Sequence, residues 1–146
     1  MSDCVFCRIA SGSTDPELTV HEDEHVFIQI SLHQKASNRG HVLVIPKSHV
    51  SNLYEATSFL DAPLLAALRL ASIAVKKTFL ADGIQLRQNN GAAAGQDVFH
   101  LHFHVIPRYD GDNFDDTEYE IVSHGERVVL ADRLRSSLNE EARHQE

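Results

Sequence analysis

The chain has 146 residues, of which 42% are hydrophobic and 23% are charged, and its formal net charge is −8 at pH 7. This length predicts one domain over residues 1–146, with enough apolar residues for one sizeable core. The acidic balance argues against a nucleic-acid partner, because such proteins present a basic face to the phosphates. The sequence shows no secretory leader and no apolar run near the roughly 20 residues that span a bilayer, so we expect a cytoplasmic protein without a membrane partner.

The first third of the chain predicts one short helix followed by strands. The helix is expected near residues 4–10, where Gly12 and Pro16 follow and end it. Two short strands are expected on either side of a polar turn, and a compact apolar run rich in β-branched residues predicts a third, buried strand. The predicted strands cover residues 19–21, 25–30 and 41–45.

The clearest periodic segment predicts a long helix in the middle of the chain. Asp61 is the expected N-cap, and Pro63 lies in the first turn. Apolar residues then recur every three or four positions up to Phe79, which places them on one helix face. Lys76 and Lys77 suit the negative end of the helix dipole, and Gly83 is expected to end the helix.

The last third predicts two strands, at residues 84–88 and 98–106, joined through a turn at 89–91. An acidic segment at 110–120 is interpreted as a solvated linker that contains one more extended piece. Ser123 and Glu126 have the spacing of a capping box, which predicts a last helix at about 126–142 as a C-terminal extension. Because strands and helices do not alternate, the order predicts an α+β fold with an antiparallel sheet.

The most informative segment alternates apolar residues with His100, His102 and His104. In a strand these three imidazoles share one face, and the apolar residues point the other way. A half-exposed strand that carries three histidines by coincidence explains the pattern poorly. One metal ion held by all three is disfavoured, because each two-residue step spans about 6.6 Å. Nucleophilic catalysis fits better, since a neutral imidazole can attack phosphorus and a neighbouring imidazolium can stabilise phosphate oxygens.

The segment that precedes the histidines suits phosphate chemistry. It runs from Gly91 through three alanines to Gly95 and Gln96. Small residues allow backbone N–H groups to approach an anion closely. Such loops are common, so this one gains weight only from its position three residues before the histidines.

These motifs together resemble the histidine triad (HIT) superfamily, in particular its small bacterial-type hydrolases with a Cys-x-x-Cys pair. The resemblance rests on the histidine pattern that ends in Ile106, on the opening Cys4-Val-Phe-Cys7-Arg-Ile9, and on the stretch Gly40–Lys47 followed by His49. Asn89-Asn-Gly91, Gly95-Gln96 and Ile106-Pro-Arg-Tyr109 extend it. The resemblance implies an antiparallel sheet of about five strands, one long helix, one or two shorter helices, and a homodimer that joins two sheets.

The resemblance also implies roles for individual residues. His102 matches the nucleophile, which forms a covalent nucleotidyl-histidine that water then cleaves. His100 matches the histidine that orients the surroundings of the nucleophile, and His104 and His41 match residues around the phosphate. Other matched positions hold the substrate near its α-phosphate (Asn89, Gly95 and Gln96) or line the nucleoside pocket (Val5, Phe6, Ile9 and Phe27). The four pocket residues would equally suit an ordinary core.

Two positions depart from the family pattern. The family often has Asp after the second strand, where it accepts hydrogen bonds from the ribose, and Ser31 stands at the corresponding place. The residue after Gln96 is commonly Ser or Thr near the leaving group, and here it is Asp97. A carboxylate beside phosphate oxygens is repulsive unless it is protonated or turned away. Ribose recognition and leaving-group preference are therefore expected to differ from the family pattern.

Cys4 and Cys7 form a pair that could be half of a zinc site, a redox pair or two ordinary thiols. A redox pair normally opens a helix after a strand, and only three residues precede this one. A half-site needs two further ligands, and the resemblance supplies His49 and His100. Such a Cys2His2 site implies structural Zn²⁺ near the nucleophile, with no catalytic metal on the protein.

The expected function is hydrolysis at the α-phosphate of purine nucleotides. Nucleoside phosphoramidates and dinucleoside polyphosphates are the substrate classes that the resemblance implies. Two alternatives remain open. One is a nucleotidyl transferase or phosphorylase, in which another acceptor replaces water. The other is a regulatory protein that binds nucleotide but, through Ser31 and Asp97, turns it over weakly.

Overall fold

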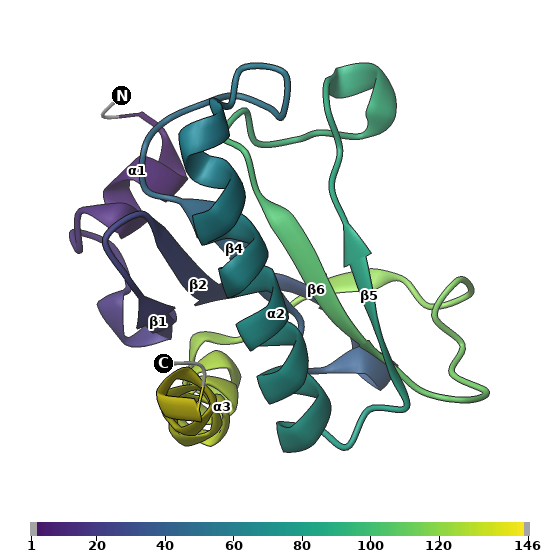
Figure 1. Ribbon diagram of the computed structural model, residues 1–146. Coiled ribbons are helices and arrows are strands. Elements are labelled where there is room, and N and C mark those ends of the chain that lie inside the picture. The colour runs from purple at the N-terminus through teal and green to yellow at the C-terminus, as the bar shows by residue number, and fades with distance from the viewer. Residues whose placement is uncertain (1–2, 145–146) are drawn as a thin grey trace.

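A five-stranded antiparallel sheet forms the centre of the computed structural model, which describes residues 3–144 (Figure 1). The strand order is β1-β2-β4-β6-β5, with every neighbouring pair antiparallel. This confirms the α+β class and the number of strands. The strands are β1 (Thr19–Glu22), β2 (Val26–Ile30), β4 (Val42–Pro46), β5 (Gly83–Arg87) and β6 (Phe103–Arg108).

A second, two-stranded sheet lies beside the first and was not predicted as a pair. It joins β3 (His33–Lys35) to β7 (Tyr119–Ile121), which is the extended piece of the acidic segment. Four short 3-10 helices complete the connections: η1 (Pro16–Leu18), η2 (Ala36–Asn38), η3 (Ser58–Leu60) and η4 (Ala92–Ala94). The pairing of β3 with β7 leaves Tyr119, at the end of the acidic segment, with its ring 5.8 Å from the guanidinium of Arg87 in β5.

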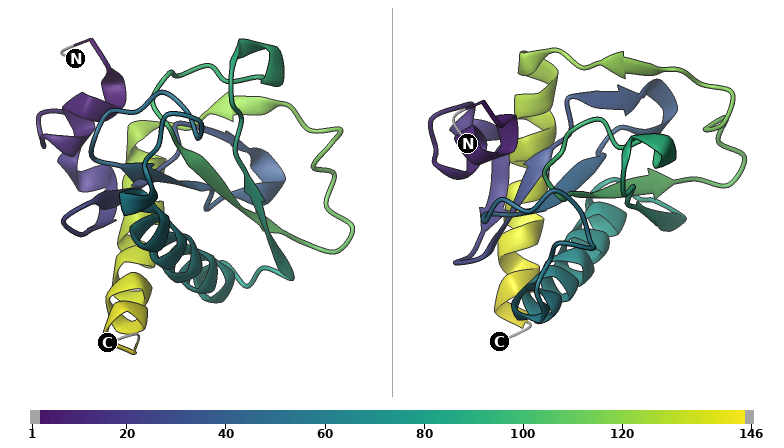
Figure 2. Two further views of the ribbon diagram at one scale, coloured as in Figure 1. Left: turned by 45° about the horizontal axis from the view of Figure 1, so that its top comes forward. Right: turned by 90° about the horizontal axis from the view of Figure 1, so that it is seen from above.

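The two faces of the main sheet are covered differently. Helices α2 (Asp61–Thr78) and α3 (His124–His144) pack on one face and on each other (Figures 1 and 2). The short helix α1 (Val5–Ala10) lies on the opposite face, where Phe6 packs with Phe27, Leu43 and Ile45. Alternate residues of β2 and β4 enter the two clusters, which explains why both strands are buried along their whole length.

Helix α2 confirms the predicted long helix but not its predicted ends. Leu60 occupies the N-cap, and Asp61 is the first helical residue without a side-chain cap. The helix ends at Thr78, and Leu80 takes the left-handed conformation with φ 53°. Gly83 instead begins β5. Leu80 supplies the reversal that was assigned to glycine, because a left-handed residue at a helix C-terminus turns the chain out of the helical path.

Residues 58–78 pass the test of length and composition for a membrane span, with a mean hydropathy of 1.6. This differs from the prediction that no such run exists. The apolar residues of α2 are accounted for by packing, since seven of them are buried in the large core cluster with the sheet and α3. We interpret α2 as the core helix of this fold.

The histidine segment forms a shorter strand than the predicted 98–106. Strand β6 begins only at Phe103, and its ladder with β4 ends at the pair Phe103 and Val44. Continuing the register would bring Leu101 opposite Pro46, which has no N–H to donate. The Leu101 N–H donates instead to the Val50 carbonyl at 2.7 Å. Before Phe103 the alternation therefore breaks down, and Phe99 is 51% exposed.

The last helix starts two residues earlier and ends two residues later than predicted. Half of the predicted capping box forms, because the Glu126 N–H donates to Ser123 Oγ at 3.2 Å. The Glu126 carboxylate does not return to Ser123 but accepts a hydrogen bond from Arg39 Nε at 3.1 Å. The start of α3 is thus held to the turn before β4 as well as capped.

Candidate active site and metal centre

A cavity of about 520 Å³ opens on the face of the sheet that α2 and α3 do not cover. Its walls come from α1, β2, β4, β5, β6, β7, the glycine-alanine loop and the start of α3. Most of the predicted site residues line it: Val5, Phe6, Ile9, Ser31, His41, Asn89, Gly95, Asp97, His102 and His104. Segments from across the whole sequence therefore meet at one cavity, as the resemblance implied.

Three predicted site residues lie behind the cavity wall. The Gln96 side chain is buried and holds the loop together, accepting from the Gly91 N–H and donating to the Ser51 and Val98 carbonyls. Phe27 is packed in the cluster beneath α1. The ring of His100 is fully buried and points to the cysteines. These residues shape the site from behind rather than contact what enters the cavity.

His102 is held in one orientation by its own strand. Its Nδ1–H donates to the His100 carbonyl at 2.7 Å, and its ring packs edge-on against Phe6. Since the carbonyl can only accept, a proton must be on Nδ1, so in the neutral ring Nε2 carries the free lone pair. The His100 backbone, rather than its ring, thus sets the tautomer of His102.

His41 and His104 form a second imidazole pair beside His102. Their Nε2 and Nδ1 atoms lie 2.9 Å apart, and the rings of His102 and His104 are 5.2 Å apart. Burial, the neighbouring histidine and Arg87 lower the pKa of His41 well below its usual value. Burial, His102 and Arg87 lower the pKa of His104 to about 4. At neutral pH both rings are therefore neutral, in contrast to the imidazolium that the sequence analysis considered.

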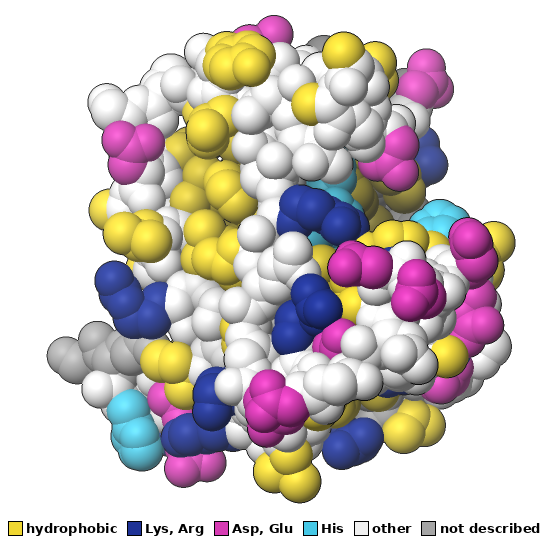
Figure 3. All heavy atoms as spheres, turned by 90° about the vertical axis from the view of Figure 1, so that its right-hand side faces the viewer, with side chains coloured by type: hydrophobic (Ala, Val, Ile, Leu, Met, Phe, Trp, Pro, Cys, Tyr) yellow, Lys and Arg dark blue, Asp and Glu magenta, His cyan; other side chains and the backbone are white. Residues whose placement is uncertain are grey.

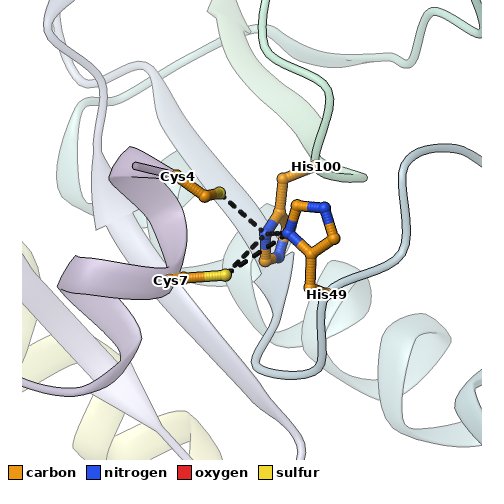
Figure 4. Close-up of side chains that lie close together, drawn as sticks. All are labelled: Cys4, Cys7, His49 and His100. Atoms are coloured by element: carbon orange, nitrogen blue, oxygen red, sulfur yellow. Dashed lines mark hydrogen bonds between the residues drawn. The ribbon is translucent and has the colours of Figure 1, made fainter. Parts of the chain in front are cut away.

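Cys4, Cys7, His49 and His100 meet in a compact cluster behind the cavity (Figure 4). Cys4 Sγ lies 3.4 Å and Cys7 Sγ 3.6 Å from His100 Nδ1. His49 Nδ1 lies 3.3 Å from Cys7 Sγ and 3.1 Å from His100 Nδ1. Ligands of a tetrahedral zinc ion at about 2.3 Å (sulfur) and 2.0–2.1 Å (nitrogen) are separated by roughly 3.3–3.8 Å. The observed separations of 3.1 to 3.6 Å are close to these values, so the four donor atoms suit one Zn²⁺.

The tautomer of His100 also supports a metal site in this cluster. His100 Nε2 donates to the Pro46 carbonyl at 2.8 Å, so the lone pair of Nδ1 points toward the thiols. Metal-binding histidines characteristically donate their second N–H in this way. When bound, a zinc ion here would fix α1, the segment after β4 and the backbone of His100, which in turn accepts from His102.

Some cavity residues were missed by the sequence analysis. The most consequential are Arg87 at the end of β5, Tyr119 of β7 and Arg127 of α3. On the β5 side of the molecule, basic side chains lie next to histidine among acidic neighbours, and hydrophobic side chains gather on the same face (Figure 3). No short motif marks these residues, because the tertiary fold rather than sequence proximity brings them to the cavity.

Known proteins place this chain in a family. A family model for the HIT domain matches residues 13–111, and the chain belongs to the HIT family. It is 42% identical over 113 residues to "Protein hit" of Bacillus subtilis (strain 168), covering 77% of this chain and 76% of that protein. It is 40% identical over 111 residues to the adenylylsulfatase HINT3 of Arabidopsis thaliana, covering 76% of this chain but only 55% of that protein.

A solved structure supports the assignment of the fold. The chain superposes with a TM-score of 0.80 on a zinc-bound histidine triad family protein from Mycobacterium smegmatis, at 33% identity and with 95% of each chain covered. This agreement confirms the HIT fold. That protein is described as zinc-bound, and this chain brings two cysteines and two histidines together in a cluster that could hold a metal ion.

Proposed function

We propose that this protein hydrolyses purine nucleotides at the α-phosphate through a covalent nucleotidyl-His102 intermediate. The observation that carries the proposal is the 2.7 Å hydrogen bond from His102 Nδ1–H to the His100 carbonyl. In the neutral ring it makes Nε2 the unprotonated nitrogen, on a histidine that lines the cavity. A neutral, oriented imidazole is the form that attacks phosphorus.

The reaction requires two displacements at one phosphorus atom. In the first, the lone pair of His102 Nε2 forms an N–P bond, the bond from phosphorus to the leaving group breaks, and the leaving group takes the electron pair. In the second, a water oxygen attacks the same phosphorus, the N–P bond breaks, and the electron pair returns to Nε2. The products are a nucleoside monophosphate, the leaving group and the proton that water loses.

His41 and His104 can stabilise the phosphate oxygens without being charged. If His41 Nε2–H donates to His104 Nδ1, then His104 carries its own proton on Nε2. That N–H is available to an oxygen of the phosphate next to His102. Hydrogen bonds aimed at developing charge in a buried site are worth more than in water. The pair therefore contributes oriented donors to the phosphate oxygens.

The nucleoside end of the cavity is apolar with one polar side chain. Phe6, Ile9 and Leu43 line it, next to Ser31. The Ser31 hydroxyl donates to the His33 carbonyl at 2.9 Å. Its proton is thus used within the protein, and its lone pairs remain as acceptors for a ribose hydroxyl. Ser31 therefore supplies a neutral acceptor at this position.

We also propose that Cys4, Cys7, His49 and His100 hold structural Zn²⁺ and that the protein is a homodimer. When bound, the metal supplies a fixed cross-link between segments rather than chemistry on the substrate. The dimer is supported by β5, which is an edge strand of the described sheet, and by the hydrophobic side chains gathered on that side (Figure 3). Unpaired edge strands are surfaces on which a second sheet can continue.

The test is hydrolysis of adenosine 5′-phosphoramidate and diadenosine tetraphosphate by the wild-type protein and by His102→Ala. His124→Ala is the matched control, because His124 is exposed and does not line the cavity. We expect turnover by the wild type and the control and none by His102→Ala. Equal turnover by all three proteins would overturn the proposal. Transfer of the nucleotide to an added phosphate in preference to water would instead show a transferase.

A further inference from the structure

Arg87 is a cation beside the reacting histidines that the proposed mechanism does not use. It is the last residue of β5 and is the register partner of His104 in β6. Residues directly opposite each other in an antiparallel pair project to the same face of the sheet. Arg87 accordingly lines the same cavity as His102 and His104. Its charge also reaches the histidines, since it contributes to the lowered pKa of both His41 and His104.

The guanidinium of Arg87 is only partly satisfied by the protein. One terminal nitrogen donates to the Tyr119 hydroxyl at 2.5 Å, and the guanidinium lies over the Tyr119 ring. Nε is buried and has no hydrogen-bond partner among the described residues. No ion pair involves Arg87 in the described part of the chain. Nε itself is shielded, so the terminal N–H groups are the donors that an oxyanion in the cavity would meet, and an anion there would offset the unpaired charge.

Three side chains in register on adjacent strands, Leu43, His104 and Arg87, form a row across the sheet along the cavity. His104 pairs with Leu43 of β4 on one side and with Arg87 of β5 on the other. The row therefore runs from an apolar residue, next to Phe6 and Ile9, through the histidines to a cation. A nucleotide placed with its base among the apolar residues and its α-phosphate at the histidines directs its leaving group to Arg87.

We propose that Arg87 binds the leaving group, and that the preferred substrates are anhydrides in which a nucleoside monophosphate is joined to a second phosphate or to a sulfate. This inference rests on the proposed function and selects one class of leaving group for it. Phosphate and sulfate share the chemistry that Arg87 recognises, a tetrahedral oxyanion bound by a planar fork of N–H donors. Nucleoside phosphoramidates, which release a neutral amine, offer Arg87 no such group.

The protonation of the site agrees with this choice. When the bond to phosphorus breaks, a phosphate or sulfate leaves as an anion and needs no proton, whereas an amine must acquire one. His41 and His104 are both neutral at pH 7 because of the lowered pKa of each ring, so neither is a ready imidazolium donor. The chemistry that the site can complete unaided is the departure of an anion.

Asp97 opposes Arg87 and is the weaker of the two charges. It lines the cavity and raises the pKa of His104 slightly against the larger lowering effects. Asp97 is exposed and Arg87 is half-buried. Water and salt screen exposed charges more strongly than buried ones. The net field at the leaving-group end is therefore set by Arg87.

The test compares kcat/KM for three substrates: diadenosine tetraphosphate, adenylyl sulfate and adenosine 5′-phosphoramidate. In Arg87→Gln, we expect kcat/KM for one or both anhydrides to fall at least about tenfold more than for the phosphoramidate, which is the scale of a hydrogen bond to a charged group. The anhydride that loses more identifies phosphate or sulfate as the natural partner of Arg87. Arg87→Lys should retain most of the anhydride preference.

Arg127→Gln is the matched control. Arg127 lines the same cavity, but its Nε donates to the Val122 carbonyl, and Val122 is bonded to Leu32 at the Ser31 end. This variant removes the same charge from a different wall of the cavity, on α3, so it should change all three substrates by the same factor. Equal losses in Arg87→Gln, or an anhydride-selective loss in Arg127→Gln, would overturn the inference.

A binding measurement separates this inference from the proposed function. In His102→Ala, which cannot form the intermediate, calorimetry should show that ADP binds at least tenfold more tightly than AMP. Adding Arg87→Gln to that variant should abolish the difference. If wild type shows no turnover but ADP is preferred through Arg87, hydrolysis fails and the oxyanion site stands. If turnover occurs but Arg87 gives ADP no advantage, the oxyanion site fails and hydrolysis stands.

Discussion

The two faces of the main sheet carry different parts of what this protein does. The face under α2 and α3 is an apolar cluster in which Val105, Leu101 and Leu134 are fully buried. The opposite face buries His41, His100 and His102 in polar contacts, next to an open cavity. Strand β6 serves both, because Val105 enters the core while His104 lines the cavity. The comparison teaches that stability is concentrated on one face and chemistry on the other, with one strand holding them in register.

The largest expected effect of a single change on the cavity face is on catalysis alone. His102→Ala should lower kcat by at least about 10⁴-fold, as loss of a covalent nucleophile does elsewhere. The free energy of unfolding should change by less than about 1 kcal/mol, because His102 packs at a cavity wall rather than in the large core. Steady-state kinetics and urea titration measure the two quantities. A loss of several kcal/mol of stability in His102→Ala would contradict the conclusion that this face carries chemistry and the other face carries stability.

A change on the helix-covered face should do the opposite. Leu134→Ala in α3 removes a fully buried side chain and should lower the free energy of unfolding by about 2–5 kcal/mol. Well below the unfolding transition, kcat/KM should stay within about twofold of wild type, since Leu134 is not among the residues that line the cavity. The exposed Val129 in the same helix provides a matched control, and Val129→Ala should leave both quantities near wild type.

Loss of the metal from the cysteine-histidine cluster should lower both stability and catalytic activity, unlike a change on either face of the sheet. We expect one zinc per chain by metal analysis, and loss of that zinc in Cys7→Ser. The variant should unfold at a lower temperature, because a bound metal stabilises the folded state that holds its ligands. Its kcat should also fall, by about tenfold, since the His100 carbonyl that orients His102 belongs to a metal ligand. Ser11→Ala, at the C-terminal end of α1, should leave the zinc content, the unfolding temperature and kcat unchanged.

The last expected effect is gradual, and it is a pH dependence of stability that arises on the cavity face. The pKa of His104 is about 4 in the folded protein, against about 6.5 in an unfolded chain. Between these values the unfolded state binds a proton that the folded state does not. Stability should therefore be complete above pH 6.5 and fall by about 1.4 kcal/mol per pH unit as pH decreases toward 4.

The control for this prediction is His104→Gln, which removes one titrating group from the cavity. Its stability should fall less steeply than that of wild type between pH 6.5 and pH 4.5, when both are followed by urea unfolding. His41, whose pKa is also lowered, should maintain part of the slope in the variant. Identical slopes in the two proteins would show that His104 does not enter the folded protein as a neutral ring.

Most of the fold was predictable because local patterns set it. The periodicity of α2, the apolar run of β4 and the capping box of α3 each depend on neighbours in sequence. The length of the histidine strand was not predictable from alternation alone, since it depends on Pro46 in a different strand. The pairing of β3 with β7 was missed because three-residue strands joined by such distant pairing carry little local signal.

The sequence likewise predicted some residues of the candidate site and missed others. The histidines, the cysteine pair and the loop glycines were found because their spacing is itself a signal. Gln96 and Phe27 were assigned to the substrate, but their side chains are used within the protein. Arg87, Tyr119 and Arg127 were missed because only the tertiary fold brings them to the cavity. Residues that act through register with another strand cannot be recognised from their own surroundings in sequence.

The central claim is that His102 becomes covalently bonded to the nucleotide during turnover. The most direct measurement is the intact mass of the protein, stopped within the first turnovers on diadenosine tetraphosphate, followed by mapping of the modified peptide. We predict one added adenylyl group per chain, located on His102 and absent in His102→Ala. Turnover without an adduct in the wild type, or an adduct on His104 that persists in His102→Ala, would contradict the account.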